Sequence, residues 1–448
     1  MNTVEISEYF NTNYCDYSSY DNYRKIASMV DGNKISSRKC LYVILKDNIK
    51  NPVKVQNFIS EAAKRTNYVH GASSLYGVTV GMAQNFPGTN NIPLLKRKGA
   101  FGTRTIPDAA ADRYIFTCME DIIPKIFMSE DTPNLQEQIF EGDVIEPKCY
   151  VPVIPMLLVN GAIGLTTGFS QKILSRDPKE LIKWIKAKLS NKKFNGKLLP
   201  YFNGFKGSVI ENEAEGSYTI YGTFQKVSGN KIEINDVPIG YDLQGYLKVL
   251  DKLIDQKKIK DYEDLSEGND FHIIVTFWRN QGLDIDKCDI IQELKLSKSV
   301  TESYTSLNED NKVVEYKNVE ELLEAFYKVR YEYYQKRIDY QIKKLTEALV
   351  INASKYTFIK GIIDGTIVIN NKSDDVIYSQ LDKIDAIKRV DDSYSYLLNI
   401  PCSQLTKEKY QKLKEQIKED KIKLQEAKKV TVEELWNNDL DELLKVLK

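Results

Sequence analysis

Two long amphipathic segments in the last third of the chain dictate much of its architecture. The first opens at Asn318, where Asn318-Val319-Glu320-Glu321 predicts a helix start of the capping-box type. Apolar side chains then recur mostly every three or four residues, as in one continuous helix with an apolar stripe; they are Val319, Leu322, Phe326, Val329, Tyr333, Ile338, Ile342, Leu345 and Leu349. A second segment of this kind starts at Thr406, with Tyr410, Leu413, Ile417 and Leu424 on one side.

An apolar-rich stretch, residues 352–402, lies between the two segments. Two long helices that leave and return around a compact tip predict an antiparallel coiled-coil arm, and an apolar tip is a suitable dimer contact. A helical bundle closed within one chain is the alternative for this pattern.

The part of the chain before these helical segments shows two different sequence patterns. Residues 20–145 mix short helical and strand patterns with Gly/Asn-rich turns, whereas residues 150–310 are rich in strand patterns. Because 448 residues are too many for one core, we predict an α+β multidomain protein. Its predicted parts are residues 1–145, residues 146–310, an arm at residues 311–430, and a last helix at residues 431–448, opened by a capping box at Thr431.

The charge is unevenly distributed although the chain is neutral overall. Residues 20–117 hold 15 Lys/Arg against 6 Asp/Glu, which suits a localised polyanion site, and equally a basic face on an ordinary domain. Arg113 and Tyr114 lie in this stretch. A phenol becomes a useful nucleophile when cations stabilise its anion and the phosphate that it attacks. An isolated Arg-Tyr pair is more often a surface tyrosine beside a solvated arginine.

Several other classes of site leave no pattern in the sequence. The six cysteines form no CxxC pair and do not cluster with His70 or His272, so neither a disulfide framework nor a zinc site is readable. No apolar run is long enough for a membrane span, and the first residues do not have the pattern of a signal peptide. We therefore expect a soluble protein of the cytoplasm, without a membrane partner.

Several distinctive sequence blocks run in one collinear series along nearly the whole chain. The blocks in the basic stretch are residues 24–34 (Arg24 to Lys34), Arg38-Lys39, His70-Gly71-Ala72, Ala83-Gln84-Asn85-Phe86 and Phe101-Gly102-Thr103-Arg104. Later blocks are residues 158–168, 204–209, 358–365 and 435–441. In this order and spacing the blocks resemble the DNA breakage-reunion region of type IIA DNA topoisomerases. They are closer to the eukaryotic and T-even phage branch than to bacterial gyrase, and the chain is similar to the medium subunit of the phage enzymes.

The resemblance implies a winged-helix breakage domain, a β-rich tower domain and a coiled-coil arm that ends in a helical dimerisation tip. It implies that Tyr114 forms a transient 5′-phosphotyrosyl bond, with Arg113, Arg24 and His70 around the scissile phosphate. It further implies that Lys34, Arg38, Lys39 and Arg104 contact the gate DNA and that Leu165 is a wedge between base pairs. Without the resemblance, these four cations are a solvated face, His70 is a structural histidine and Leu165 is a core leucine.

The sequence departs from the family pattern at several places near these blocks. Val69 stands where a first histidine is frequent, Ala72 where an acid is, and Ala100 where a glutamine is usual; Ala27 and Ile35 replace prolines. These departures put the loop geometry and the second histidine's contribution in doubt, and they leave the nucleophile and its arginines in place.

Metal and nucleotide sites of the family have no counterpart in the sequence. Asp284-Ile285-Asp286 is the one comparable acidic pair, lacks a glutamate-glycine loop, and is assigned to a surface turn. No Gly-x-x-x-x-Gly-Lys loop is present. We therefore expect Mg²⁺ and ATP to be bound by a toprim/ATPase large subunit, in an A2B2 complex that is a homodimer of this chain through the C-gate tip and acts on double-stranded DNA.

Two other functions remain open at this point. A non-enzymatic winged-helix protein that bends DNA and dimerises through the arm explains the basic stretch but not Arg113-Tyr114. A metal-dependent nuclease requires a carboxylate cluster in the basic stretch, and five of the six carboxylates there, Asp31, Asp47, Glu61, Asp108 and Asp112, lack ligand-like spacing.

Overall fold

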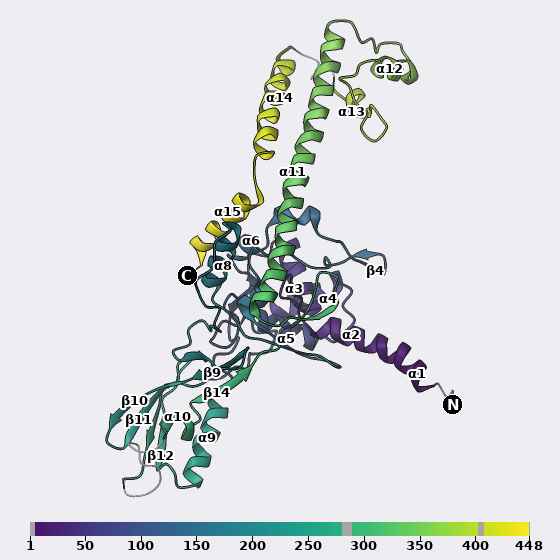
Figure 1. Cartoon of the computed structure of the whole chain (residues 1–448). Helices are drawn as coiled ribbons and strands as arrows, with labels where there is room; N and C mark the ends of the chain where they lie inside the picture. Colours follow the sequence, from purple (N-terminus) through teal and green to yellow (C-terminus); the bar gives the residue numbers. More distant parts are fainter. Residues whose placement is uncertain (1–4, 280–288, 402–406, 448) are drawn as a thin grey trace. The chain divides into compact units, whose positions relative to one another are not determined.

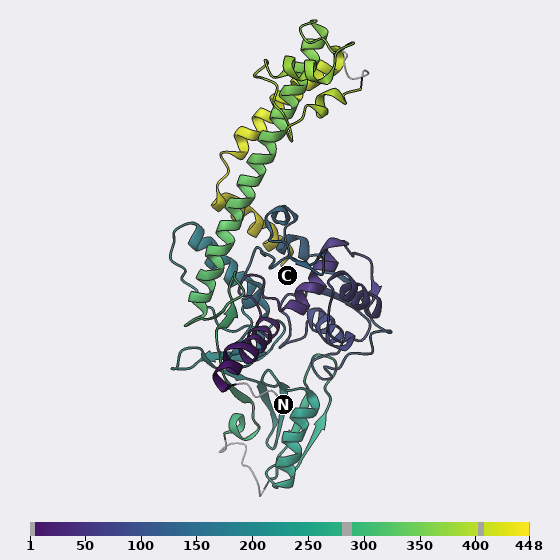
Figure 2. The same ribbon diagram turned by 90° about the vertical axis from the view of Figure 1, so that its right-hand side faces the viewer.

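The computed structural model describes residues 5–279, 289–401 and 407–447 (Figures 1 and 2). The chain divides into two compact units, one made of residues 1–331 and 437–448 and the other of residues 332–436. Asp284-Ile285-Asp286 lies outside the described residues. Among the helices that the structure describes, none combines the length and the apolar character needed to cross a membrane.

The N-terminal part of the first unit packs helices against a three-stranded antiparallel sheet of order β1-β3-β2. Helix α4 has the amphipathic spacing that this packing requires, because Val55, Phe58, Ile59 and Ala62 are buried on one face. The helices are α1 (Ile6–Tyr9), η1 (Phe10–Tyr14), α2 (Cys15–Lys25), α3 (Ile35–Lys46), α4 (Val55–Arg65) and α5 (Ala72–Ala83). The strands are β1 (Val53–Lys54), β2 (Leu95–Lys98) and β3 (Phe116–Met119). This arrangement is consistent with the winged helix implied by the resemblance.

The region that follows β3 contains short helices and two two-stranded antiparallel sheets, β4-β5 and β6-β7. Its elements are α6 (Ile123–Ile126), η2 (Ser129–Asn134), β4 (Ile139–Phe140), β5 (Asp143–Val144), α7 (Met156–Asn160), β6 (Ala162–Leu165), β7 (Ser170–Ile173) and α8 (Pro178–Leu189). Helix α8 begins with Asp177 as N-cap, whose carboxylate accepts the Lys179 N–H, and with a proline in the first turn.

Strands dominate the rest of the first unit, as the sequence predicts for residues 150–310. One sheet has the order β14-β9-β8 and another the order β10-β11-β13-β12. Helix α9 buries Tyr246, Leu250 and Leu253 in the apolar core of the second sheet, beside which it lies in Figure 1. The elements are β8 (Ser208–Glu211), β9 (Ser217–Tyr221), β10 (Thr223–Ser228), β11 (Lys231–Asp236), α9 (Leu243–Asp255), β12 (Asp261–Asp264), β13 (Ile273–Thr276), α10 (Ile290–Glu293), β14 (Ser297–Thr301), β15 (Thr305–Leu307) and β16 (Val313–Glu315).

The long helix expected from Asn318 is α11 (Val319–Ile363). Its start is a capping box, since the Glu321 N–H donates to Asn318 Oδ1 at 3.0 Å and the Glu321 carboxylate accepts the Lys317 N–H. The predicted apolar stripe is buried at Val319, Leu322 and Phe326 and half-buried from residue 342 to residue 349.

Within the second unit, α11 runs antiparallel to α14 (Lys407–Ala427). Asn352 Nδ2 donates to Asp420 at 2.9 Å, and the stacked rings of Tyr356 and Tyr410 bring their hydroxyl oxygens 2.5 Å apart. The stretch between the helices has its own apolar core around Phe358, Leu381 and Leu397. It contains α12 (Asp374–Leu381) and α13 (Ser395–Leu398), and α15 (Val432–Val446) closes the chain.

Candidate active site

Tyr114 lies on a tight turn immediately before β3. Its N–H donates to the Ala111 carbonyl at 2.9 Å, and the next residue, Ile115, is buried while its carbonyl accepts the Val55 N–H at the start of α4. Burial of Ile115 leaves the neighbouring phenol in solvent, so that the Tyr114 side chain is 64% exposed. The guanidinium carbon of Arg113 lies 4.7 Å from the centre of the Tyr114 ring.

The loop that leads to Tyr114 is held against α5. Gln84 Nε2 donates to the carbonyls of Phe101 and Pro107, at 2.9 and 3.0 Å. Gly102 has φ +83°, and a Cβ there would meet the Pro107 carbonyl oxygen at 2.2 Å, so only glycine fits this crossing. The Tyr76 hydroxyl donates to the Ala110 carbonyl at 2.9 Å. These contacts give the exposed phenol a defined backbone position.

Arg24 and His70 lie near each other beside α2. The Tyr20 hydroxyl oxygen lies 2.6 Å from His70 Nε2, and Arg24 follows Tyr20 by one helical turn. Burial and the positive charge of Arg24 lower the pKa of His70 below its ordinary value. Within the described residues, no hydrogen bond joins this pair to Tyr114, whose contacts are with Arg113 and the loop before it.

Leu165 lies on a hairpin that is tied to α2. Strand β6 pairs with β7, and residues 163 and 165 point to the same side, with Ile163 70% and Leu165 75% exposed. Asp21 of α2 accepts hydrogen bonds from the Thr167 N–H and hydroxyl, at 3.1 and 3.3 Å. The sequence prediction included Leu165 and missed Ile163, although the i, i+2 spacing on a strand was the signal for it.

Lys34 supports the same hairpin. Its Nζ donates to the Ile163 carbonyl at 2.7 Å, and burial lowers the pKa of Lys34. The side chain is half-buried, so the Lys34 ammonium lies against the backbone that carries the exposed apolar pair.

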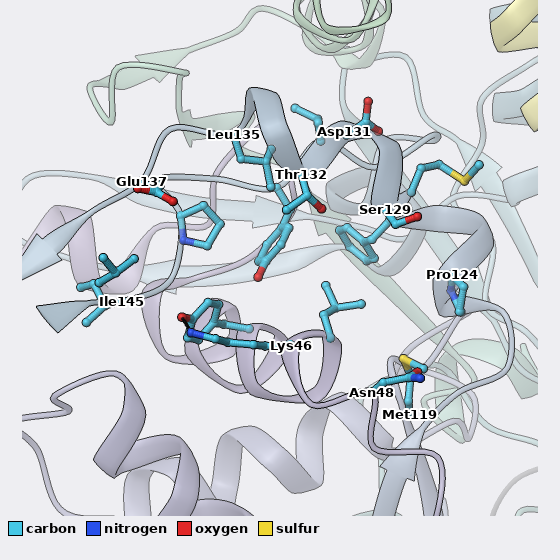
Figure 3. A pocket seen from close by; sticks show the side chains of 18 residues that line it. Lys46, Asn48, Met119, Pro124, Ser129, Asp131, Thr132, Leu135, Glu137 and Ile145 are labelled. Atoms are coloured by element: carbon cyan, nitrogen blue, oxygen red, sulfur yellow. Dashed lines mark hydrogen bonds between the residues drawn. The ribbon is translucent and has the colours of Figure 1, made fainter. Parts of the chain in front are cut away.

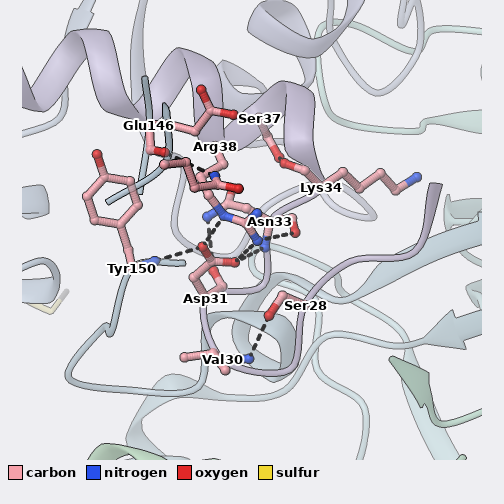
Figure 4. A network of polar contacts seen from close by, with 10 residues as sticks. Ser28, Val30, Asp31, Asn33, Lys34, Ser37, Arg38, Glu146 and Tyr150 are labelled. Atoms are coloured by element: carbon pink, nitrogen blue, oxygen red, sulfur yellow. Dashed lines mark hydrogen bonds and ion pairs between the residues drawn. The ribbon is translucent and has the colours of Figure 1, made fainter. Parts of the chain in front are cut away.

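The other three residues predicted to contact DNA phosphates, Arg38, Lys39 and Arg104, form interior ion pairs in this structure. Arg38 is 1% exposed and pairs with Asp31 at 2.7 Å; Asp31 also accepts the N–H groups of Asn33 and Tyr150 (Figure 4). Lys39, 8% exposed, pairs with Glu146 at 2.9 Å. Arg104, 3% exposed, pairs with Asp236. This burial argues against direct phosphate contact by any of the three.

The arginine of the first pair keeps its charge in spite of its surroundings. Burial alone would lower the pKa of Arg38, but the Asp31 carboxylate outweighs this effect and the pKa is raised. The pair therefore links the loop before α3 to the backbone at Tyr150, more than 100 residues later in the chain.

A cavity of about 590 Å³ lies beside α3 (Figure 3). It is lined by α3 side chains such as Tyr42 and Lys46 and by the segments around Phe127 and Tyr150, and no predicted site residue lines it. In residues 5–279, 289–401 and 407–447, no three His, Cys, Asp or Glu side chains gather in a way that could hold a metal ion.

Comparison with known proteins gives consistent matches over nearly the full chain. Residues 24–441 match the model of the DNA gyrase/topoisomerase IV A-subunit family. The chain is 32% identical to the mitochondrial DNA topoisomerase 2 of Dictyostelium discoideum, over 99% of this chain and 35% of that protein. It is 30% identical to the DNA topoisomerase 2 of Invertebrate iridescent virus 6, over 98% of this chain and 39% of that protein. The chain thus spans little more than a third of the length of these relatives.

A solved structure matches the fold as well. It is the crystal structure of the Plasmodium falciparum topoisomerase II DNA-binding, cleavage and re-ligation domain, with a TM-score of 0.83 and 31% identity, over 98% of this chain and 64% of that one. The predicted α+β multidomain architecture is confirmed by this match.

Proposed function

Since this chain belongs to the DNA gyrase/topoisomerase IV A-subunit family, we propose that it is the DNA-cleavage and religation subunit of a type II DNA topoisomerase. The resemblance to the breakage-reunion region of type IIA enzymes, inferred from the sequence, is confirmed by the family and fold matches. The observation that carries the proposed activity is Tyr114 itself: an exposed phenol on a rigid turn, with an arginine beside its ring.

The proposed reaction is a transesterification. The Tyr114 hydroxyl oxygen attacks a backbone phosphorus, the bond from phosphorus to the 3′ oxygen breaks, the phenolic proton leaves, and the 3′ oxygen gains a proton. The products are a 5′-phosphotyrosyl ester and a free 3′-hydroxyl. One phosphodiester replaces another, so the reverse reaction reseals the strand without an external energy source.

The charged groups near the phenol and near α2 have complementary roles in this proposal. Arg113 is permanently charged and exposed beside Tyr114, so it suits the stabilisation of charge on the attacked phosphate. Arg24 and His70 form the second group, which we assign to the phosphate oxygens of the same strand. When DNA is bound, the backbone of the strand bridges the two groups.

Bending of the DNA is assigned to the hairpin β6–β7. Its two exposed apolar side chains, Ile163 and Leu165, lie on one side and form a wedge that can enter a base step. Lys34 holds the backbone of the wedge in place, because its ammonium donates to the Ile163 carbonyl. Unstacking a step costs a few kcal/mol, which the longer protein surface along bent DNA offsets.

Metal and nucleotide chemistry is assigned to a partner. As the resemblance to type IIA enzymes implies, we assign Mg²⁺ and ATP binding to a toprim/ATPase large subunit in an A2B2 complex. The homodimer contact of this chain would be the tip of the second unit, where Ile363, Val368 and Val376 are exposed. By the wording of its sequence blocks the chain is of the phage medium-subunit type, acting in the host cytoplasm.

A covalent-capture experiment tests the activity. The chain is mixed with a toprim/ATPase partner, Mg²⁺ and supercoiled plasmid, the mixture is denatured, and protein bound to 5′ ends is measured. We expect Tyr114→Phe to abolish attachment and Tyr340→Phe, a change at an exposed tyrosine of α11, to leave it intact. Attachment that survives in Tyr114→Phe excludes this nucleophile. Bending without attachment supports the architectural protein, and cut ends that cannot be resealed support the nuclease.

A further inference from the structure

His70 is held in place by two tyrosines. Its Nε2 lies 2.6 Å from the Tyr20 hydroxyl oxygen, and the Tyr68 ring meets the imidazole edge-on, with centroids 5.4 Å apart. In the described part of the chain, Tyr20 is the hydrogen-bond partner of the imidazole. The preceding residue, Val69, is apolar and 69% exposed, so it cannot replace that bond. The sequence predicted that His70 lies at the scissile phosphate, but it did not identify a hydrogen-bond partner for the imidazole.

Helix α2 determines where the Tyr20 hydroxyl lies. Tyr20 and Arg24 are four residues apart and therefore project from one face of the helix. Asp21, on the neighbouring face, pairs with Lys25 at 2.7 Å and accepts two hydrogen bonds from Thr167. Because these anchors do not involve the phenol, loss of the Tyr20 hydroxyl should leave the helix in place.

We propose that Tyr20 is a positioning residue that holds His70 in its neutral Nδ1–H tautomer, so that the ring presents an N–H donor to a phosphate oxygen. A neutral imidazole has one donor and one acceptor nitrogen, and the bond made by one nitrogen decides where the proton resides. In this proposal the Tyr20 O–H is the donor to Nε2 across the 2.6 Å contact, so the ring proton is on Nδ1. The charged or titratable groups around the ring are Tyr20 and Arg24 from α2 and Tyr68 from the segment before α5; burial and Arg24 both favour the neutral ring.

This inference rests on the proposed function and narrows it. Two roles are open to an imidazole beside a scissile phosphate, charge stabilisation and proton transfer. In the Nδ1–H tautomer, Nε2 is occupied by Tyr20 and Nδ1 already carries a proton, so the ring cannot accept the proton of Tyr114. Hydrogen-bond donation to the phosphate is the role that remains.

The tautomer can be measured on the full chain without DNA or a partner. His70 and His272 are its only histidines, so ¹⁵N NMR of the imidazole rings can be assigned with a His272→Gln variant. We expect the Nδ1–H form for His70 near neutral pH and a shift to the Nε2–H form in Tyr20→Phe. Tyr17→Phe, at an exposed tyrosine one turn earlier on α2, should change nothing. An Nε2–H ring in the parent, or an unchanged ring in Tyr20→Phe, overturns the proposal.

In the cleavage assay, the same variants distinguish a residue that positions His70 from a residue that only stabilises the fold. Tyr20→Phe should cleave about five- to tenfold more slowly, the effect of one lost hydrogen bond in the transition state, with DNA affinity unchanged. A normal cleavage rate in Tyr20→Phe refutes the positioning role. If the parent forms no covalent product at all, the proposed function fails, and the NMR result still decides the tautomer.

Discussion

Replacing Arg38 by methionine should destabilise the protein and leave its affinity for DNA unchanged. The guanidinium donates to both Asp31 oxygens, at 2.7 and 3.1 Å, and the two side chains are 2% and 0% exposed. Removing one member of such a pair costs about 3–5 kcal/mol, because the other charge stays in surroundings that solvate it poorly. Asp31 keeps the N–H donors of Asn33 and Tyr150, so we expect the lower end, about 3 kcal/mol.

Thermal unfolding of the full chain measures this loss. A change of that size lowers the unfolding midpoint by about 4 °C, because the unfolding entropy is about 2.1 cal/mol/K per residue and the first unit has about 340 residues. Arg97→Met, at an exposed arginine of β2, is the matched control and should change stability by less than about 0.5 kcal/mol. DNA binding is then titrated against salt well below the transition. A phosphate contact would instead preserve stability, weaken binding and reduce the slope of log K against log[salt] by about 0.9, and that result would refute the structural role of Arg38.

The other predictions concern α2 and its neighbours. Leu165→Ala should reduce the bend of a bound duplex, measured by energy transfer between its ends; an unchanged bend argues against the wedge. Asp21→Ala should reduce the bend as well, because Thr167 loses its acceptor, and a full bend would show that α2 does not hold the hairpin. An NMR titration should give His70 a pKa below its ordinary value, raised only in part by Arg24→Met because burial is the larger cause. Since the unfolded chain then takes up the proton first as pH falls through about 6.5, stability should decline with acid there, and His70→Gln should remove that component of the decline.

Features that depend on neighbouring residues could be predicted from the sequence. The start of α11 could be predicted from Asn318 and Glu321, which are three residues apart. The Glu321 N–H donates to the Asn318 side chain, and the Glu321 carboxylate accepts the Lys317 N–H. The loop before Tyr114 contains Gly102, whose positive φ agrees with the turn expected there. In each case the interacting residues are close together in the sequence, so a local sequence pattern can predict the interaction.

The burial of the basic residues could not be predicted in this way. Lys39 pairs with Glu146 and Arg104 with Asp236, 107 and 132 residues further along the chain. A count of charges in residues 20–117 leaves both carboxylates out, so it reports an excess of cations where the folded chain has paired ones. The contact of Tyr20 with His70 spans 50 residues and escaped sequence analysis for the same reason.

The residues expected around the scissile phosphate and the wedge residue Leu165 come from separate blocks of sequence, and α2 connects Arg24, His70 and Leu165. It carries Arg24, its Tyr20 holds His70, and its Asp21 holds the hairpin of Leu165. A movement of this helix would therefore change the imidazole and the wedge together. Tyr114 is held by a different support, the loop packed on α5. The nucleophile and the groups assigned to the phosphate thus rest on two elements, and a DNA strand bound to both would complete the site.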